Sequence, residues 1–158
     1  MPWRAGLRRR VQHYGWAYDY RARRVSASDR IGPLPGWLAS EAERLVERGL
    51  FASQPDQAIV NEYLPGQGIA AHVDCEPCFG DRVASLSLGS SCVMDFREVA
   101  SGQRSSMHLA PGSLLVLAGA ARYDWTHAIA PRRSDMIDGI RRARGRRVSI
   151  TFRTVRLG

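Results

Sequence analysis

Residues 61–74 read NEYLPGQGIAAHVD, which places two runs of strand-forming residues on either side of the turn signal Pro65-Gly66. Proline presets one backbone angle of a turn, and glycine adopts conformations that other residues avoid. Side chains two residues apart in a strand point to the same face, so half-buried strands alternate in polarity. We therefore predict strands over 57–63 and 69–73, joined through Pro65-Gly66.

The same pattern of short strands separated by turn signals continues along the chain. Turn signals recur at Gly89, Ser101-Gly102, Pro111-Gly112 and Gly119. Many short, evenly spaced strands are typical of a sandwich, barrel or jelly roll. Beyond the two strands above, the expected strands are 82–88, 92–96, 105–109, 114–117 and 147–155.

One helix is expected ahead of these strands. Its apolar residues recur at helical spacing, and Gly49 supplies a C-terminal stop. These residues are Leu38, Ala42, Leu45 and Val46. Residues 131–146 are charged without apolar periodicity and are interpreted as a flexible loop. No repeat or linker divides the 158 residues, so we expect one domain, 1–158.

The tripeptide His72-Val73-Asp74 is a candidate metal site. Residues i and i+2 of a strand point the same way, so His72 and Asp74 can chelate one ion. Of the remaining histidines, His127 is a better third ligand than His13 or His108. Two histidines and one carboxylate are the ligand set of non-haem Fe(II) oxygenases. The tripeptide also arises by chance, and its alternative interpretation is surface or hydrogen-bonded core residues.

The chain is strongly basic, with a net charge of +8. Such a charge favours a polyanionic partner, for which nucleic acid is the usual case. All 23 basic residues are arginine, which excludes a lysine Schiff base or a lysine general base. The sequence has no apolar run long enough to span a membrane and no apolar signal core. We therefore expect a soluble, cytoplasmic protein.

Four blocks of sequence resemble the AlkB family of Fe(II)- and 2-oxoglutarate-dependent dioxygenases. They read NEYLPGQGIAAHVD, VASLSLGSSCVMDF, GSLLVLAGAARYDWTHAI and RRVSITFRTVR. The resemblance extends from about Arg8 to Arg156. It is strongest to the branch that contains the animal hydroxylase of modified wobble uridine in tRNA. The fold it implies is mostly β with a flanking helix, built on a double-stranded β-helix (jelly-roll) core.

The resemblance also implies the cofactors and the residues that hold them. Fe(II) would be bound by His72, Asp74 and His127, with 2-oxoglutarate and O2 as co-substrates. An arginine pairs a carboxylate through two parallel hydrogen bonds and stays charged at any working pH. The expected 2-oxoglutarate-binding residues are Asn61, Tyr63, Arg147, Ser149, Thr151 and Arg153. Ser149 stands where many members of the family have asparagine.

The implied reaction couples decarboxylation of 2-oxoglutarate to hydroxylation of a substrate C–H bond. On an N-alkyl group the hydroxylated product collapses and releases formaldehyde, whereas on other carbons the hydroxyl stays. The implied substrate is an alkylated or modified base of single-stranded DNA or RNA, including tRNA, and a monomeric enzyme is expected. The implied roles are DNA or RNA dealkylation repair and RNA base hydroxylation.

The N-terminal residues are the expected substrate side. Residues 1–31 would form a nucleotide-recognition lid, and 34–158 the supporting helix and jelly-roll core. The ring-rich segment 13–20 alternates rings with small or polar residues, which predicts a strand or hairpin with its rings on one face. Aromatic faces stack on bases of any sequence. The expected substrate-binding residues are Tyr14, Trp16, Tyr18, Glu76 and Arg122.

Two alternatives stay open from the sequence. One is a zinc-containing nucleic-acid-binding module without catalysis, built on His72, Asp74 and the pair Cys75 and Cys78. The other keeps the dioxygenase chemistry but acts on a protein or lipid. The cysteine count is three, and this odd number argues against a disulfide framework.

Overall fold

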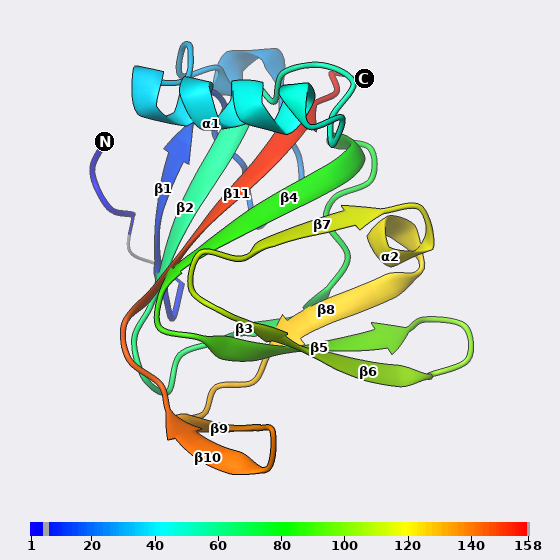
Figure 1. The fold of residues 1–158 in the computed structure, drawn as a ribbon. Coiled ribbons are helices and arrows are strands. Elements are labelled where there is room, and N and C mark those ends of the chain that lie inside the picture. The colour runs from blue at the N-terminus through cyan, green and yellow to red at the C-terminus, as the bar shows by residue number, and fades with distance from the viewer. Residues whose placement is uncertain (5–6, 158) are drawn as a thin grey trace.

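The computed structural model describes residues 1–4 and 7–157 and consists of two antiparallel sheets packed face to face (Figure 1). The larger sheet runs in the order β1 (Arg10–Tyr14), β2 (Gln57–Tyr63), β11 (Arg147–Val155), β4 (Phe79–Gly89) and β7 (Leu114–Ala118). The smaller sheet runs β3 (Ile69–His72), β8 (Trp125–Ile129), β5 (Cys92–Glu98) and β6 (Arg104–Leu109). This arrangement confirms the expected jelly roll.

The helix α1 (Gly36–Glu47) covers the outer face of the larger sheet, on the side away from the smaller sheet (Figure 1). Its apolar residues Leu38, Ala42 and Leu45 are buried against Phe152 of β11. Gly49, just beyond the helix, has a φ of +69°, a conformation that glycine adopts at low cost. The predicted helix and its stop are therefore confirmed.

The space between the sheets is apolar towards β5 and β7 and polar along β11. A buried cluster joins Tyr63, Val83, Met94, Leu117 and other residues from strands of both sheets. On β11 the alternate residues 148, 150 and 152 pack towards α1. The other face of β11 therefore points into the space between the sheets.

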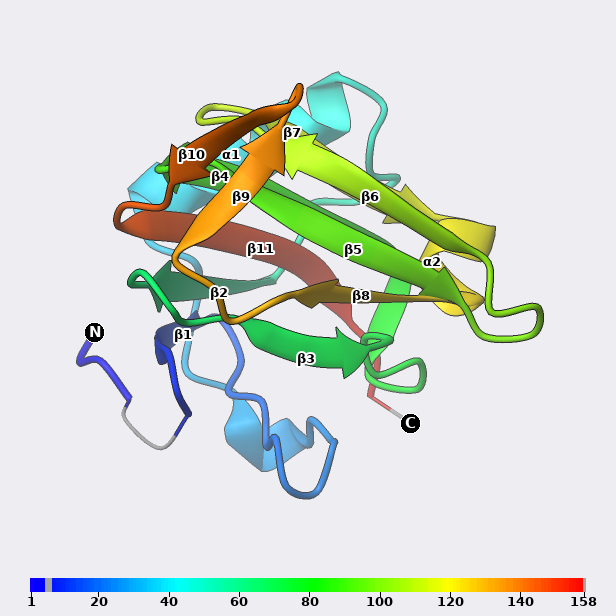
Figure 2. The same cartoon turned by 90° about the horizontal axis from the view of Figure 1, so that it is seen from below.

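A short hairpin, β9 (Ser134–Ile137) and β10 (Ile140–Ala143), lies where the sequence suggested a flexible loop over 131–146 (Figure 2). That prediction was wrong because charge pairing, rather than apolar periodicity, holds the hairpin. The buried Asp135 accepts hydrogen bonds from Arg144 at 2.6 and 2.8 Å and from Arg132 at 2.9 Å. All four residues of β10 are exposed, so its sequence shows no apolar alternation.

The N-terminal segment departs from the expected strand or hairpin over 13–20. Strand β1 ends at Tyr14, and Gly15 turns the chain with a φ of +76°. A Cβ atom on this glycine would lie 1.8 Å from the carbonyl oxygen of Asp56. The turn breaks the period of two, so the rings separate: Tyr14 packs on Trp37, and Tyr18 packs on Phe79.

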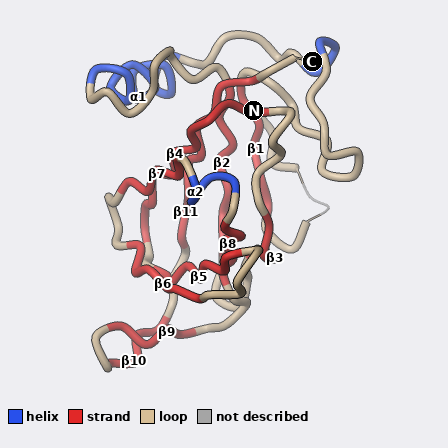
Figure 3. Tube along the Cα trace, turned by 90° about the vertical axis from the view of Figure 1, so that its right-hand side faces the viewer, coloured by secondary structure: helices blue, strands red, loops and turns tan. Residues whose placement is uncertain are grey.

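Besides α1, the described structure has two short helices, and the rest consists of strands and loops (Figure 3). They are the 3-10 helix Ala27–Asp29 and the single-turn α2 (Ala120–Tyr123), which connects β7 to β8. No helix within the described residues has the length and apolar character needed to cross a membrane.

Candidate active site

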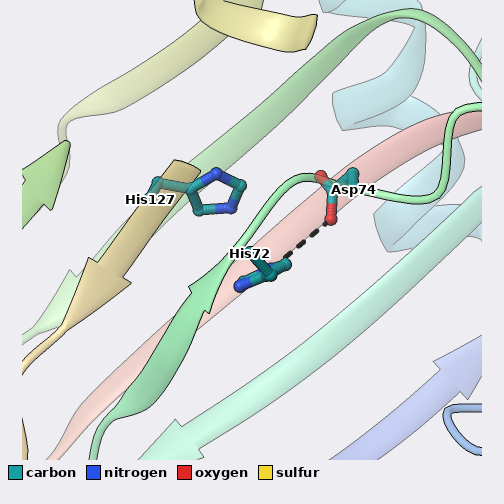
Figure 4. Close-up of side chains that lie close together, drawn as sticks. All are labelled: His72, Asp74 and His127. Atoms are coloured by element: carbon teal, nitrogen blue, oxygen red, sulfur yellow. Dashed lines mark ion pairs between the residues drawn. The ribbon is translucent and has the colours of Figure 1, made fainter. Parts of the chain in front are cut away.

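Strand pairing brings two of the candidate metal ligands together. In the smaller sheet β3 pairs with β8, and His72 lies directly opposite His127. Their ring centroids are 4.3 Å apart. Asp74 lies two residues beyond His72, where the chain leaves β3 (Figure 4). One ligand atom from each of the three residues lies within 4.8 Å of the others.

The charge state of this cluster suits metal binding. Burial alone would raise the pKa of the Asp74 carboxyl, but Arg153 and the two histidines outweigh it and hold that pKa far below its usual range. Burial lowers the pKa of His127 to about 4, against the partial opposing effect of Asp74. At neutral pH the site therefore presents a carboxylate and a neutral imidazole, which are the forms that coordinate metals.

A cavity of about 350 Å³ between the two sheets contains this cluster. The inward face of β11 forms part of its wall, together with the buried Asn61 and Tyr63 of β2. The inward residues of β11 are Arg147, Ser149, Thr151 and Arg153, all buried. The structure thus brings into one cavity every residue expected at the iron and 2-oxoglutarate sites.

The two arginines of β11 are held at opposite ends of this face. Arg147 donates to Ser87 Oγ at 2.8 Å. Arg153 donates to Asp74 Oδ1 and to Gln57 Oε1, each at 3.2 Å. Burial raises the pKa of Tyr63, so its phenol remains protonated and can donate a hydrogen bond.

The polar atoms left over in the cavity fit the expected cofactors. Among the described residues, Asp74 Oδ2, Arg147 Nε and Nη1, and Arg153 Nε are buried without a hydrogen-bond partner. Buried polar groups are normally paired. One carboxylate with two imidazoles matches an Fe(II) site, and unpaired guanidinium N–H groups match the carboxylates of 2-oxoglutarate.

Of the residues expected to bind substrate, only Tyr18 lines the cavity. Tyr14 packs against Trp37, next to α1. The indole nitrogen of Trp16 lies 3.1 Å from Asp56 Oδ2, and Glu76 is exposed. The structure does not place Tyr14, Trp16 or Glu76 in the cavity wall.

Arg122 has a different role from the substrate contact that the sequence suggested. It is only 2% exposed, and its guanidinium donates to the carbonyls of Asp74 at 2.9 Å, Cys75 at 3.3 Å and Gly80 at 3.2 Å. Because Arg122 lies on α2, these bonds connect α2 to the loop in which Asp74 lies. The expectation that Arg122 contacts substrate is therefore corrected: the residue positions the loop that carries Asp74.

The two cysteines after Asp74 form the disulfide Cys75–Cys78, and Cys92 is free and buried. The odd cysteine count argued against a disulfide framework, and the described residues contain one bridge between near neighbours and one free thiol. A zinc site built on these two cysteines would need both as thiolates, and here their sulfurs are joined. The structure thus contradicts the zinc-module alternative.

Three further residues of the N-terminal segment line the cavity: Arg9, Tyr20 and Arg23. The sequence placed them on the substrate side but did not single them out as cavity residues. Arg9 precedes β1 and shares the buried face of Val11 and His13, a period-two pattern that could have revealed it. Tyr20 lies in the ring-rich segment, where the turn at Gly15 hid which rings point inward. No pattern in the sequence distinguishes Arg23 from its arginine neighbours.

Comparison with known proteins identifies a matching family and several relatives. The model of the 2OG-Fe(II) oxygenase superfamily matches residues 4–153. The mouse protein tRNA (carboxymethyluridine(34)-5-O)-methyltransferase ALKBH8 is 39% identical over 94% of this chain and 25% of its own length. The Arabidopsis thaliana alkylated DNA repair protein ALKBH8 homolog is 36% identical over 98% of this chain and 51% of its own. The chain thus spans between a quarter and about half of these relatives.

Two solved structures share the fold. OsALKBH1 superposes with a TM-score of 0.64 at 19% identity, covering 94% of this chain and 78% of its own. A prolyl-4-hydroxylase from Pseudomonas putida superposes with a TM-score of 0.55 at 20% identity, covering 94% and 69%. Both match the jelly-roll core described above.

Proposed function

The chain belongs to the AlkB family within the 2OG-Fe(II) oxygenase superfamily, and we propose that this 2-oxoglutarate-dependent dioxygenase oxidises alkyl groups on the bases of single-stranded DNA or RNA. The outcome is either removal of the alkyl group or a stable hydroxyl on a modified base. The observation that carries the proposal is one cavity holding the His72, Asp74 and His127 cluster, two inward arginines and the ring of Tyr18.

The proposed metal ligands are His72, Asp74 and His127. Bound Fe(II), with 2-oxoglutarate and O2, supplies the oxidising power to hydroxylate a C–H bond. The protein keeps Asp74 ionised through Arg153 and keeps His127 neutral through burial. Cross-strand pairing sets the distance between the imidazoles of His72 and His127. Arg122 fixes the loop of Asp74 by donating a hydrogen bond to the backbone carbonyl of that residue.

The proposed 2-oxoglutarate site is the inward face of β11 with Asn61 and Tyr63. Arg147 offers buried N–H groups to one carboxylate, and its own bond to Ser87 fixes its orientation. Arg153 lies beside Asp74, so it can neutralise charge at both the metal ligand and the co-substrate. Ser149 and Thr151, on the same face between the two arginines, complete the polar wall.

Support for a nucleic-acid substrate comes from charge, rings and relatives. The chain has a net charge of +8. Tyr18 and Tyr20 border the cavity from the N-terminal segment, where residues 1–31 are proposed to act as the lid. The names of the mouse and Arabidopsis relatives refer to a tRNA nucleoside and to alkylated DNA. Stacked rings and surface arginines are the features that bind single strands.

Mass spectrometry of products tests this function directly. Methylated single-stranded DNA and RNA oligonucleotides are incubated with the protein, Fe(II), 2-oxoglutarate and ascorbate. Loss of a methylene mass indicates demethylation, and gain of an oxygen mass indicates stable hydroxylation. Succinate formation that is stimulated by methylated peptides or lipids, with every oligonucleotide unchanged, would contradict the nucleic-acid proposal.

A further inference from the structure

Arg9 is a buried arginine that faces the cavity and is not among the residues proposed above to bind iron or 2-oxoglutarate. It is 8% exposed and lines the cavity just before β1. Its Nε donates to Asn61 Oδ1 at 2.9 Å. The guanidinium lies 6.0 Å from the ring centroid of Tyr20 and 5.8 Å from that of Tyr63. Within the described residues, no hydrogen bond engages its two terminal nitrogens.

The charges that line the cavity leave Arg9 without a counter-ion. The described lining contains four arginines, Arg9, Arg23, Arg147 and Arg153, but only one carboxylate, Asp74. Asp74 is paired with Arg153. Fe(II) and the dianion 2-oxoglutarate cancel each other's charge, and Arg147 serves the co-substrate. Because an unpaired buried charge is costly, the loaded cavity favours a further anion near Arg9.

The neighbours of Arg9 place it between the proposed 2-oxoglutarate wall and the N-terminal segment, because its Nε bonds to Asn61 and its guanidinium lies near the rings of Tyr63 and Tyr20. Arg147 is tied to Ser87 on β4, within the larger sheet. Arg9 instead contacts Tyr20, in the N-terminal segment proposed as the lid. Arg23 also lines the cavity, but it is exposed, and its guanidinium lies 3.5 Å from the carbonyl of Val73. Arg9 is therefore the cation that is both oriented and available.

We propose that Arg9 binds an oxyanion of the substrate and so selects substrates that carry negative charge beside the oxidised group. With Nε committed to Asn61, the terminal nitrogens form a planar edge that suits two oxygens of a phosphate or carboxylate. The oxyanion is either the phosphate next to the target nucleotide or an acidic group on the base itself. This inference rests on the proposed nucleic-acid function.

Binding measurements on Arg9 variants test the proposal. Anisotropy of a labelled single-stranded oligonucleotide is measured with Mn(II) and 2-oxoglutarate bound, so that no turnover occurs. Arg9→Gln should weaken binding about tenfold, and Arg9→Lys less, because lysine keeps the charge but loses the planar pair of donors. The matched control Arg48→Gln, an exposed charge just beyond α1, should change binding less than about twofold.

A second measurement separates a substrate role from a co-substrate role. Calorimetric titration of 2-oxoglutarate into the Mn(II)-loaded protein reports on the co-substrate alone. If Arg9→Gln lowers the affinity for 2-oxoglutarate as much as that for the oligonucleotide, the substrate subsite is refuted. Equal oligonucleotide affinity for Arg9→Gln and wild type would refute it as well. Circular dichroism of each variant verifies that the protein is folded.

Small probes identify the source of the oxyanion. Thymidine 5′-monophosphate is compared with thymidine, and uracil-5-carboxylate with uracil-5-carboxamide. Wild type should prefer the anion in one pair, and Arg9→Gln should abolish that preference; the pair affected identifies phosphate or base acid. If neither pair shows an anion preference that depends on Arg9, the proposal is overturned. These probes remain informative even if no oligonucleotide binds, an outcome that would instead refute the proposed function.

Discussion

The two sides of the cavity are built in different ways. On one side β11 pairs with β2 and with β4 along most of its length, so each inward side chain has a neighbour strand on both flanks. On the other side, in the segment after Gly15, the described β pairing consists of isolated bridges within the segment itself, such as Trp16 to Arg30 and Asp19 to Arg24. Groups proposed for iron and 2-oxoglutarate lie on or next to paired strands, and Tyr18 and Tyr20 lie on the segment with few backbone bonds.

This difference matches the demands on each side. Ligand distances and co-substrate contacts must stay constant through every reaction cycle, which a hydrogen-bonded sheet ensures. A single-stranded nucleic acid must enter and leave, which favours groups carried on loops. Substitutions on the sheet side should therefore abolish the reaction, and those on the N-terminal side should change substrate binding.

The largest effect is expected from Asp74→Ala. It removes the only carboxylate that lines the described cavity and leaves Arg153 without its ion-pair partner. Succinate formation should fall more than about 1000-fold, and Mn(II) binding should be lost. The exposed Asp81→Ala, on β4, is the control and should retain activity. Unchanged turnover in Asp74→Ala would rule out the metal assignment.

The next largest effect is expected at the 2-oxoglutarate end. Arg147→Lys keeps the charge but loses the planar donors that suit a carboxylate, so the KM for 2-oxoglutarate should rise about 10- to 100-fold. Steady-state succinate formation over a range of 2-oxoglutarate concentrations measures this change. The matched control is Arg146→Lys, at the exposed residue that immediately precedes β11. Its KM for 2-oxoglutarate should stay near that of wild type. A wild-type KM in Arg147→Lys would place the co-substrate elsewhere.

The same contrast explains what could be predicted from the sequence. Positions 147, 149, 151 and 153 were expected on one face because a strand repeats every two residues, and all four line the cavity. The pairing of His72 with His127 could not be derived from spacing, since it depends on a register between strands far apart in the chain. The sequence favoured His127 over His13 and His108 as the third ligand, and the family resemblance strengthened that choice, but neither gave the register.

The failures cluster where local periodicity carries no information. Arg122 sits on a helix of a single turn, so no pattern indicated that it points inward. The hairpin β9–β10 depends on Asp135 and its arginines, which resemble a solvated loop in the sequence. The rings of 13–20 were assigned to one face because they alternate with small or polar residues, and this assignment failed because the turn at Gly15 ends the strand.

A smaller effect is expected when the support behind the metal ligand is removed. Arg122→Gln cannot reach the carbonyls of Asp74, Cys75 and Gly80 together, so the loop of Asp74 should loosen. Mn(II) affinity should drop about tenfold, as is usual for groups that orient metal ligands. The control is Arg82→Gln, which also loses bonds to backbone carbonyls, of Gly49 and Leu50, but far from the metal ligands. Equal metal affinities for the two variants would show that Arg122 acts on stability alone.

The smallest effect should appear on the N-terminal side as a dependence on pH. His13 is buried on β1, and its Nδ1 accepts a hydrogen bond from the backbone N–H of Tyr18 at 3.1 Å. Burial, reinforced by the nearby Arg4, Arg153 and Arg9, lowers its pKa from 6.5 to about 4. The unfolded chain therefore binds this proton more readily than the folded protein does. The resulting stability is complete above pH 6.5 and is lost as the pH falls towards 4.

Protonation would also remove the acceptor for Tyr18, because both nitrogens of an imidazolium are donors. The N-terminal segment should thus detach in acid before the sheet unfolds. Urea unfolding at pH 7 and pH 4.5 should show that wild type loses ~2 kcal/mol more than His13→Gln, which cannot titrate. Hydrogen exchange should show the Tyr18 amide losing protection in acid while the β11 amides keep theirs. If both regions lose protection together, the two sides of the cavity unfold as one unit and the contrast between them fails.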